Sequence, residues 1–228
     1  MSKRIVVAID GPAGAGKSTI ARRLAGKLNF LYIDTGAMYR AVGLWALNRK
    51  TSLDDAHRLE QLAKEARIEL DRNGRVTLNG EDITDRIRTQ QVADAASKVS
   101  AIGGVRRALL DKQRSYADQH SVVMEGRDIG TVVFPQAGIK IFLDASVEIR
   151  ATRRLKELQE KGASASYEEI AADIRDRDHR DRNRAEAPLM QAPDALFLDS
   201  SNLSIEEVEE AILKIVRDRT SNGKEVAR

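Results

Sequence analysis

Short apolar runs separated by longer helical stretches dominate the pattern along the chain. The first run, residues 5–9, is rich in β-branched side chains and is typical of a buried strand. Ile20, Leu24 and Leu28 then recur at helical spacing. Four further apolar runs occupy residues 30–33, 122–124, 139–143 and 196–198. Because strands that alternate with helices are typical of parallel sheets, we expect an α/β fold with a five-stranded parallel sheet flanked by helices.

Two helix starts are marked by capping boxes. Ser166 is followed by Glu169, and Ser204 by Glu207, which are the spacings at which side chains and backbone N–H groups satisfy each other at a helix N-terminus. One face of the final predicted helix is apolar: Ile205, Val208, Ile212, Ile215 and Val216. The polar residues 219–228 are expected to form a disordered tail.

Residues 65–85 interrupt the alternation of strands and helices. Two segments of alternating polarity, residues 66–71 and 75–80, flank the turn-forming pair Asn73 and Gly74. We interpret them as a small antiparallel β insertion between helices, within an inserted region of about residues 50–100. The alternative is an extra hairpin on the edge of the main sheet.

Composition narrows the class of protein. The 228 residues suit a single domain, predicted over residues 1–218, and 42% are hydrophobic against 32% charged. There is no cysteine, which excludes disulfides, a thiolate metal site and a cysteine nucleophile. The three histidines lie far apart in sequence, which argues against a metal site built from histidines. No signal peptide or membrane span is expected, so we predict a cytoplasmic enzyme. The net charge of +3 offers little support for nucleic-acid binding.

The segment after the first strand has the pattern G-x-x-x-x-G-K-[ST] and is called the P-loop here (residues 11–18). Its glycines let backbone N–H groups turn toward phosphate oxygens at the positive end of a helix. Lys17 is expected to reach the β- and γ-phosphates, and the Ser18 hydroxyl to bind Mg²⁺. A chance glycine-rich turn is the alternative, and the flanking strand and helix argue against it. The predicted ATP-binding residues of this segment are Gly11, Pro12, Ala13, Gly14, Ala15, Gly16, Lys17, Ser18 and Thr19.

Other classes of P-loop protein have motifs that this chain lacks. There is no N-K-x-D guanine reader and no strand of four apolar residues ending in Asp-Glu. The chain instead offers arginines at strand ends and in one dense cluster.

The first arginine follows the second predicted strand. Thr35 and Tyr39 supply hydroxyls there, and Arg40 supplies a fork suited to phosphate. Ligands of open α/β sheets bind beyond the carboxyl ends of the strands, so these side chains can face the P-loop. A helix cap followed by an ordinary helix face is the alternative.

Arg127 and Asp128 follow the third predicted strand. The carboxylate can accept from the exocyclic amine of a nucleobase, and the guanidinium can donate to ring acceptors. The alternative is a structural ion pair at a strand end.

Residues 172–184 contain five arginines interleaved with acids on a predicted helix. Arg177, Asp181 and Arg184 fall on one face, and two guanidiniums held by one carboxylate would suit a transferring phosphoryl group. Arg153 and Arg154 could add to this clamp. Such a charged run is more commonly a solvated, ion-paired face.

Together these motifs resemble the bacterial cytidylate kinases over nearly the whole chain. The Gly-Arg-Asp-x-Gly-Thr-Val-Val-Phe-Pro block and the Arg-Asp-Arg-Asn-Arg block are more specific than the P-loop. The matching segments are residues 9–19, 34–40, 87–90, 92–97, 126–135, 141–145 and 180–184.

The resemblance implies a monomeric kinase that phosphorylates CMP and dCMP with ATP and Mg²⁺, with a mobile helical lid at about residues 153–168. It adds Arg153 to the residues around ATP and places Arg177 on the donor side. The acceptor-binding residues that it implies are Thr35, Tyr39, Arg40, Ser97, Arg106, Arg127, Asp128, Asp181 and Arg184; the catalytic group is Lys17, Arg177, Asp181 and Arg184.

Two other functions stay open. A kinase for UMP, dTMP or AMP would share the same motifs. A P-loop regulator or nucleic-acid-binding ATPase would use the arginine-rich helix as its basic face, although the interleaved acids argue against that.

Overall fold

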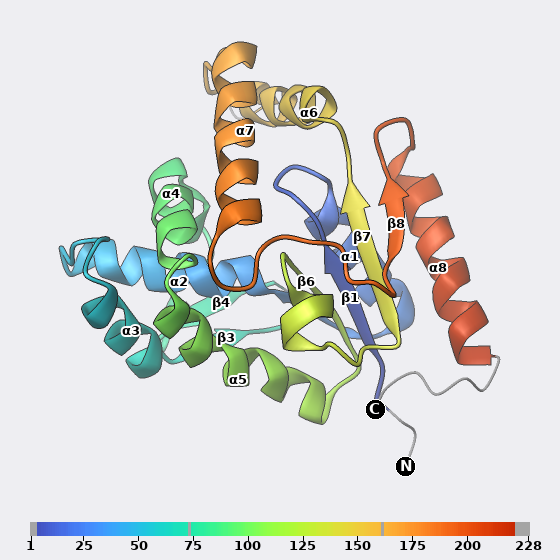
Figure 1. Ribbon diagram of the computed structural model, residues 1–228, viewed down its shortest axis with the longest axis horizontal. Helices are drawn as coiled ribbons and strands as arrows, with labels where there is room; N and C mark the ends of the chain where they lie inside the picture. Colours follow the sequence, from blue (N-terminus) through green and yellow to red (C-terminus); the bar gives the residue numbers. More distant parts are fainter. Residues whose placement is uncertain (1–3, 73, 161, 222–228) are drawn as a thin grey trace.

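A computed structural model describes residues 4–72, 74–160 and 162–221. Its main sheet is parallel and five-stranded, with the order β2-β6-β1-β7-β8 (Figure 1). All five apolar runs form strands, and the predicted α/β fold is confirmed. The strands are β1 (Val6–Asp10), β2 (Leu31–Asp34), β6 (Val122–Gly126), β7 (Ile139–Asp144) and β8 (Leu196–Asp199).

Alternate residues of β1 face opposite sides of the sheet, as the period of a strand requires. Val7 and Ile9 pack with α1 (Lys17–Leu28) and α8 (Ile205–Ser221). Val6 and Ala8 pack on the other face with a five-residue π-helix, η2 (Ile129–Val133), and side chains of α5 (Gly103–Gln119). The runs that form β1, β2, β6 and β7 are therefore buried on both faces, which is why they are continuous rather than alternating, whereas Leu196 and Phe197 of the edge strand β8 are exposed.

A separate hydrophobic core joins the helices and the small sheet on the side away from α8 (Figure 1). Residues between Ala37 and Leu109 build it, so this region packs largely within itself. Its helices are α2 (Thr35–Asn48), α3 (Ala56–Glu65), the 3₁₀ turn η1 (Arg86–Arg88) and α4 (Gln90–Val99), together with part of α5.

The small sheet is antiparallel with the order β3-β4-β5. It is separate from the main sheet, which decides against the hairpin on the sheet edge. The prediction of two strands was incomplete, since a short third strand returns beside the second; residue 73 of the predicted turn lies outside the described residues. The strands are β3 (Ile68–Leu70), β4 (Val76–Leu78) and β5 (Glu81–Asp82).

Two further helices, α6 (Val147–Glu160) and α7 (Tyr167–Asn183), stand over the carboxyl edge of the main sheet (Figure 1). The Ser166 capping box is formed, with both reciprocal hydrogen bonds present. α8 extends to Ser221, so residues 219–221 of the predicted tail are helical, and residues 222–228 lie outside the described residues. Within the described ranges, no helix has the length and apolarity to cross a membrane.

Candidate functional site

The P-loop leaves β1 through a backbone that requires glycine. Gly11 has φ 149°, and a Cβ there would lie 1.9 Å from the carbonyl oxygen of Leu143 on β7. Gly16, at φ 89°, is the N-cap of α1. The loop therefore turns its backbone toward the N-terminus of α1, which is the arrangement that binds phosphate.

Lys17 is buried at the start of α1, and its ammonium donates to the Pro12 carbonyl at 2.7 Å. Burial and, after it, the nearby charge of Arg127 together lower its pKa to about 7. A bound triphosphate would bring negative charge beside this lysine and so would raise its pKa.

Oxygen ligands gather beside Ser18 at the carboxyl ends of β2 and β6, where Asp34 and Glu125 are register partners. Glu125 is buried and accepts from the Tyr32 hydroxyl at 2.6 Å. Burial and Asp34 raise its pKa, while a hydrogen bond with Ser18 lowers it. In the described part of the chain, no three His, Cys, Asp or Glu side chains are grouped to hold a metal. The Ser18 hydroxyl and these carboxylates fit Mg²⁺, which commonly keeps its waters and binds through substrate phosphates.

The predicted acceptor residues of α2 lie at the same edge. The Thr35 hydroxyl donates to the Glu125 carbonyl at 2.7 Å. Arg40 donates to Asp34 at 2.5 Å, and Asp34 in turn caps α2. Tyr39 is buried beneath the guanidinium of Arg106, which lies 5.4 Å from its ring centre. The helix cap given as the alternative is therefore present, and the phosphate contact of Arg40 stays a prediction.

Asp128 lies between two guanidiniums from different elements. Arg106 on α5 donates to its Oδ2, and both side chains are at least nine-tenths buried. Arg184, at the C-cap of α7, holds its Nη2 3.7 Å from Asp128 Oδ1. That Nη2 is buried and has no hydrogen-bond partner, and the buried Ser97 hydroxyl on α4 also lacks one. Unsatisfied buried donors of this kind indicate a place for a polar ligand.

The arrangement of the arginine clamp differs from the predicted one. The hydrogen bond to Asp181 comes from Arg127, at 2.8 Å, rather than from the two guanidiniums on its own helix face. The Nε of Arg177 is buried without a partner. Burial, and then Arg127, lower the pKa of Arg177 to about 10. Arg127 thus joins the strand end to α7, and Arg177 keeps a donor free.

Arg153 lies outside the P-loop and reaches it through Ser200. It donates to the Ser200 carbonyl at 2.7 Å, and the Ser200 hydroxyl donates to the carbonyl of Ala15 at 3.4 Å. The predicted ATP contact of Arg153 stays a prediction.

Sequence reasoning missed Arg150, which contacts the P-loop directly. It is 2% exposed, donates to the Ala13 carbonyl at 3.0 Å and forms a bidentate pair with Asp178 on α7 at 2.6 and 3.1 Å. The available signal was Asp178, which lies three residues before Asp181 on the same face of the helix.

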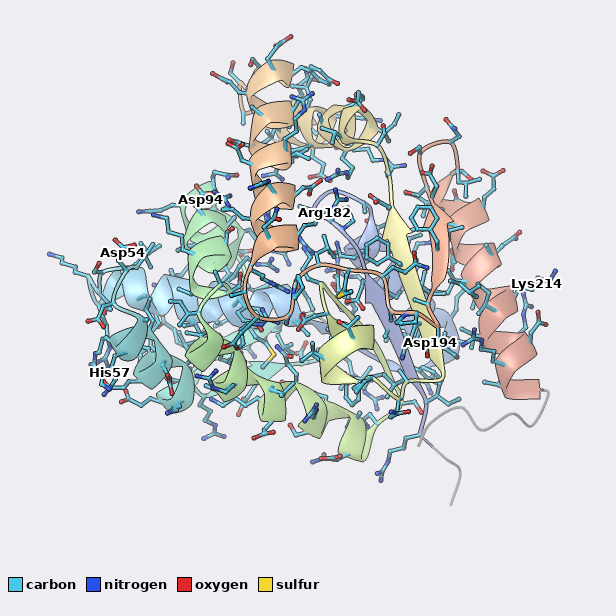
Figure 2. All side chains as sticks on the ribbon, in the orientation of Figure 1. Asp54, His57, Asp94, Arg182, Asp194 and Lys214 are labelled. Carbon is cyan, nitrogen blue, oxygen red and sulfur yellow. The ribbon has the colours of Figure 1, made fainter. Side chains whose placement is uncertain are left out.

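The outer face of α7 fits the alternative of a solvated, ion-paired face. Arg182, labelled in Figure 2, is not on that face: it turns toward the main sheet and lies 3.8 Å from Asp144 at the end of β7, with 51% of its side chain exposed. Exposed positions include Arg175, Asp176, His179 and Arg180. The helix therefore presents its clamp residues inward and ordinary surface charges outward.

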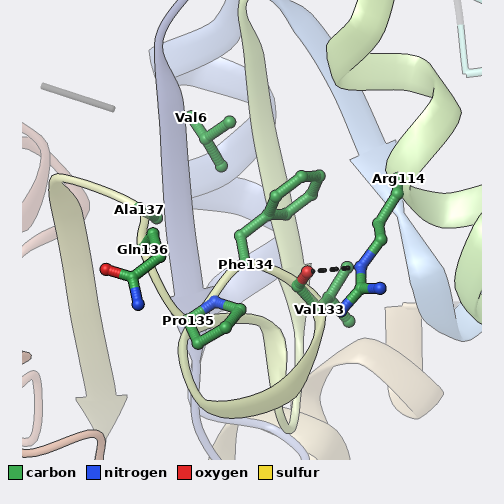
Figure 3. Close-up of a pocket in the computed structure, with 7 residues that line it drawn as sticks. All are labelled: Val6, Arg114, Val133, Phe134, Pro135, Gln136 and Ala137. Atoms are coloured by element: carbon green, nitrogen blue, oxygen red, sulfur yellow. Dashed lines mark hydrogen bonds between the residues drawn. The ribbon is translucent and has the colours of Figure 1, made fainter. Parts of the chain in front are cut away.

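Two cavities lie at the edge of the sheet opposite the P-loop. The smaller, about 220 Å³, is bounded by Val6, Arg114 and residues 133–137 (Figure 3). The larger, about 420 Å³, lies near Leu31 and His120, where β2 and β6 begin. Neither contains a predicted site residue, so both belong to the amino edge of the sheet and not to the P-loop edge.

Comparisons with known proteins agree with this geometry. The family model described as cytidylate kinase matches residues 7–218. A cytidylate kinase of Solibacter usitatus is 60% identical over 225 residues, covering 98% of this chain and 97% of that protein. One from Pasteurella multocida is 51% identical over 211 residues, covering 91% and 93%.

A solved structure of an uncharacterised protein from Eubacterium ventriosum is similar in fold, with a TM-score of 0.52 at 11% identity. It covers 95% of this chain and 100% of that chain. The two sequence comparisons carry the assignment, since they extend over the P-loop, the Asp128 turn and α7 alike: the chain belongs to the cytidylate kinase family.

Proposed function

We propose that this chain transfers the γ-phosphoryl group of ATP to the 5′-phosphate of CMP or dCMP. One structural observation supports this activity independently of the family assignment. The P-loop and the Asp128 turn leave adjacent parallel strands, where Asp10 is the register partner of Gly126. A phosphate-binding loop and a candidate base-reading carboxylate therefore share one edge of the sheet.

The reaction needs positioning and charge neutralisation more than proton transfer. An already ionised oxygen of the acceptor phosphate attacks the γ-phosphorus, the bond to the β-phosphate oxygen breaks, and ADP leaves. Lys17 and Arg177 would stabilise charge on the transferring group, and Arg40 would hold the acceptor phosphate. Mg²⁺, bound through the phosphates and the Ser18 hydroxyl, would neutralise charge on the donor.

Recognition of cytosine has a physical basis in Asp128. Its Oδ2 is engaged by Arg106, whereas its Oδ1 faces the unsatisfied Nη2 of Arg184 across 3.7 Å. Oδ1 can accept from the N4 amine of cytosine. Uracil would place its O4 oxygen against that carboxylate, an unfavourable pairing of two acceptors.

The remaining predicted residues complete the proposed site around the two nucleotides. We propose that the segment of about residues 153–168, which includes the second half of α6 and the first residues of α7, closes over bound ATP and excludes water. The proposed acceptor contacts on α2 and α4 are Thr35, Tyr39 and Ser97, and those from the β6 end and α7 are Arg127, Asp181 and Arg184.

The test is ADP formation from ATP and Mg²⁺ with CMP, dCMP, UMP, dTMP or AMP supplied separately. We expect rapid turnover with CMP and dCMP, slow turnover with the others, and loss of turnover on chelation of Mg²⁺. Turnover chiefly with another monophosphate would overturn the acceptor assignment. ADP formation indifferent to all five would favour an ATPase.

A further inference from the structure

Asp10 is a buried carboxylate to which the mechanism above gives no role. It ends β1, directly before Gly11 of the P-loop, and is 5% exposed. Its two oxygens accept hydrogen bonds at 2.7 Å from the backbone N–H groups of Ile129 and Gly130. Both donors lie immediately after Asp128.

These two N–H groups open the π-helix η2, and the first N–H groups of a helix have no partner within it. Single-turn π-helices are rare and occur frequently at functional sites. Gly130 permits the close approach, because a Cβ there would lie 3.3 Å from Asp10 Oδ2 and 3.1 Å from the Cδ of Lys140. One carboxylate thus holds the start of the segment that follows the candidate base reader.

The surroundings of Asp10 disfavour the charged form of its carboxyl group. Burial raises its pKa to about 6, and the neighbouring negative charge of Asp128 acts in the same direction. Lys17 and the two backbone N–H groups oppose that shift. A charge that burial and a like charge both disfavour is commonly retained for function.

We propose that Asp10 is a positioning residue for base recognition, which fixes the backbone of the Asp128 turn and thereby sets the direction of the Asp128 carboxylate. The inference rests on the proposed function, since it assigns Asp128 to the acceptor base. It also links the two substrates structurally, because the residue that holds the reader adjoins the first glycine of the donor loop.

Asp10→Asn tests the proposal, because an amide can accept from one N–H but turns an NH₂ toward the other. We expect kcat/KM for CMP to fall about tenfold, the worth of one such hydrogen bond. The loss should lie mainly in the KM for CMP, with a parallel fall in the preference for CMP over UMP. We expect the KM for ATP to change less than about twofold, and the unfolding midpoint to change little, since the substitution also removes a buried charge.

Asp144→Asn is the matched control. Asp144 ends the adjacent strand β7 and accepts from its neighbour Ala145 at 2.8 Å, away from the Asp128 turn. The CMP preference of this variant should equal that of the unaltered protein.

A purely structural cap predicts a different result for Asp10→Asn. Lowered stability with an unchanged ratio of CMP to UMP turnover, or an equal rise in both KM values, would overturn the proposal. Gly130→Ala is a second variant, whose Cβ crowds Asp10 Oδ2 at 3.3 Å and the Lys140 side chain at 3.1 Å. We expect it to give the same CMP-selective defect, also if Asp10→Asn fails to fold. An unaltered ratio of CMP to UMP turnover in both Gly130→Ala and folded Asp10→Asn protein refutes the proposal. If the unaltered protein prefers another monophosphate, the proposed function fails, while the split between acceptor KM and ATP KM still decides the role of Asp10.

Discussion

Asp128→Asn separates the two interactions of the Asp128 carboxylate. In the structure Arg106 donates to Oδ2, and Oδ1 lies 3.7 Å from Arg184 Nη2. Asparagine has a single acceptor oxygen. If that oxygen stays on Arg106, the amide NH₂ takes the place of Oδ1 and faces the bound base.

The magnitude follows from the donors left unsatisfied. The cytosine amine would lose its acceptor and meet another donor, which costs about 1–3 kcal/mol. That corresponds to a fall of about 5- to 150-fold in kcat/KM for CMP. The same NH₂ can donate to O4 of uracil, so kcat/KM for UMP should hold steady or rise. Arg106 would also lose a buried counter-charge, so we expect destabilisation of about 1–3 kcal/mol.

The assay is kcat/KM for CMP and for UMP at saturating ATP, with urea denaturation to measure the folded fraction. Asp176→Asn, at an exposed position of α7, is the control and should leave the CMP-to-UMP ratio unchanged. An equal fall for both monophosphates in folded Asp128→Asn protein would refute the reasoning, because Asp128 would then serve only as the counter-charge of Arg106.

Four further predictions concern the donor side and the P-loop backbone. Lys17→Ala should lower kcat by more than about 100-fold with an unchanged circular dichroism spectrum, and an unchanged rate would contradict its role. Because the pKa of Lys17 is lowered to about 7, ATP binding at pH 8 should be accompanied by the uptake of close to one proton. The uptake is measured by calorimetry in buffers of different ionisation enthalpy. No uptake would show that the amine is already charged before ATP binds. Arg177→Met should reduce kcat by about 10³-fold with little change in the KM for CMP, and a change confined to KM would place this arginine on the acceptor. Gly11→Ala should prevent stable folding, because its Cβ would lie 1.9 Å from the Leu143 carbonyl oxygen. Gly26→Ala, which has open space around it inside α1, should raise the free energy of unfolding by about 0.5–1 kcal/mol, measured by urea denaturation. Equal stabilities of the two variants would contradict this reasoning.

Four of the five strands of the main sheet could be predicted because burial on both faces leaves continuous apolar runs, as in Val7, Ala8 and Ile9 of β1. The P-loop was equally visible, because its glycines are fixed by backbone geometry. The short strand β5 was missed, since Glu81 and Asp82 are both exposed and have no apolar pattern. Elements could thus be predicted from the sequence where they leave an apolar pattern or a fixed spacing of glycines.

Pairings between distant residues could not be predicted in the same way. The sequence placed Asp181 among the arginines of its own helix, yet its partner Arg127 lies 54 residues earlier. Arg150 and Asp178 pair across 28 residues, and Asp10 reaches a backbone 119 residues away. Helical spacing brings candidates onto one face, but tertiary packing decides which opposite charge is nearest.

Three of the candidate site arginines already have carboxylate partners within the protein: Arg40 with Asp34, Arg106 with Asp128, and Arg127 with Asp181. To bind one of these guanidiniums, a simple anion such as inorganic phosphate would have to displace its carboxylate partner. Phosphate would offer that carboxylate no replacement for the lost hydrogen bonds. A nucleotide brings amine and hydroxyl donors together with its phosphate, so it can compensate both members of a separated pair. Internal neutralisation should therefore disfavour small competing anions at these three arginines, so that phosphate buffer inhibits through the P-loop, Arg177 and Arg184 rather than through the whole set of arginines.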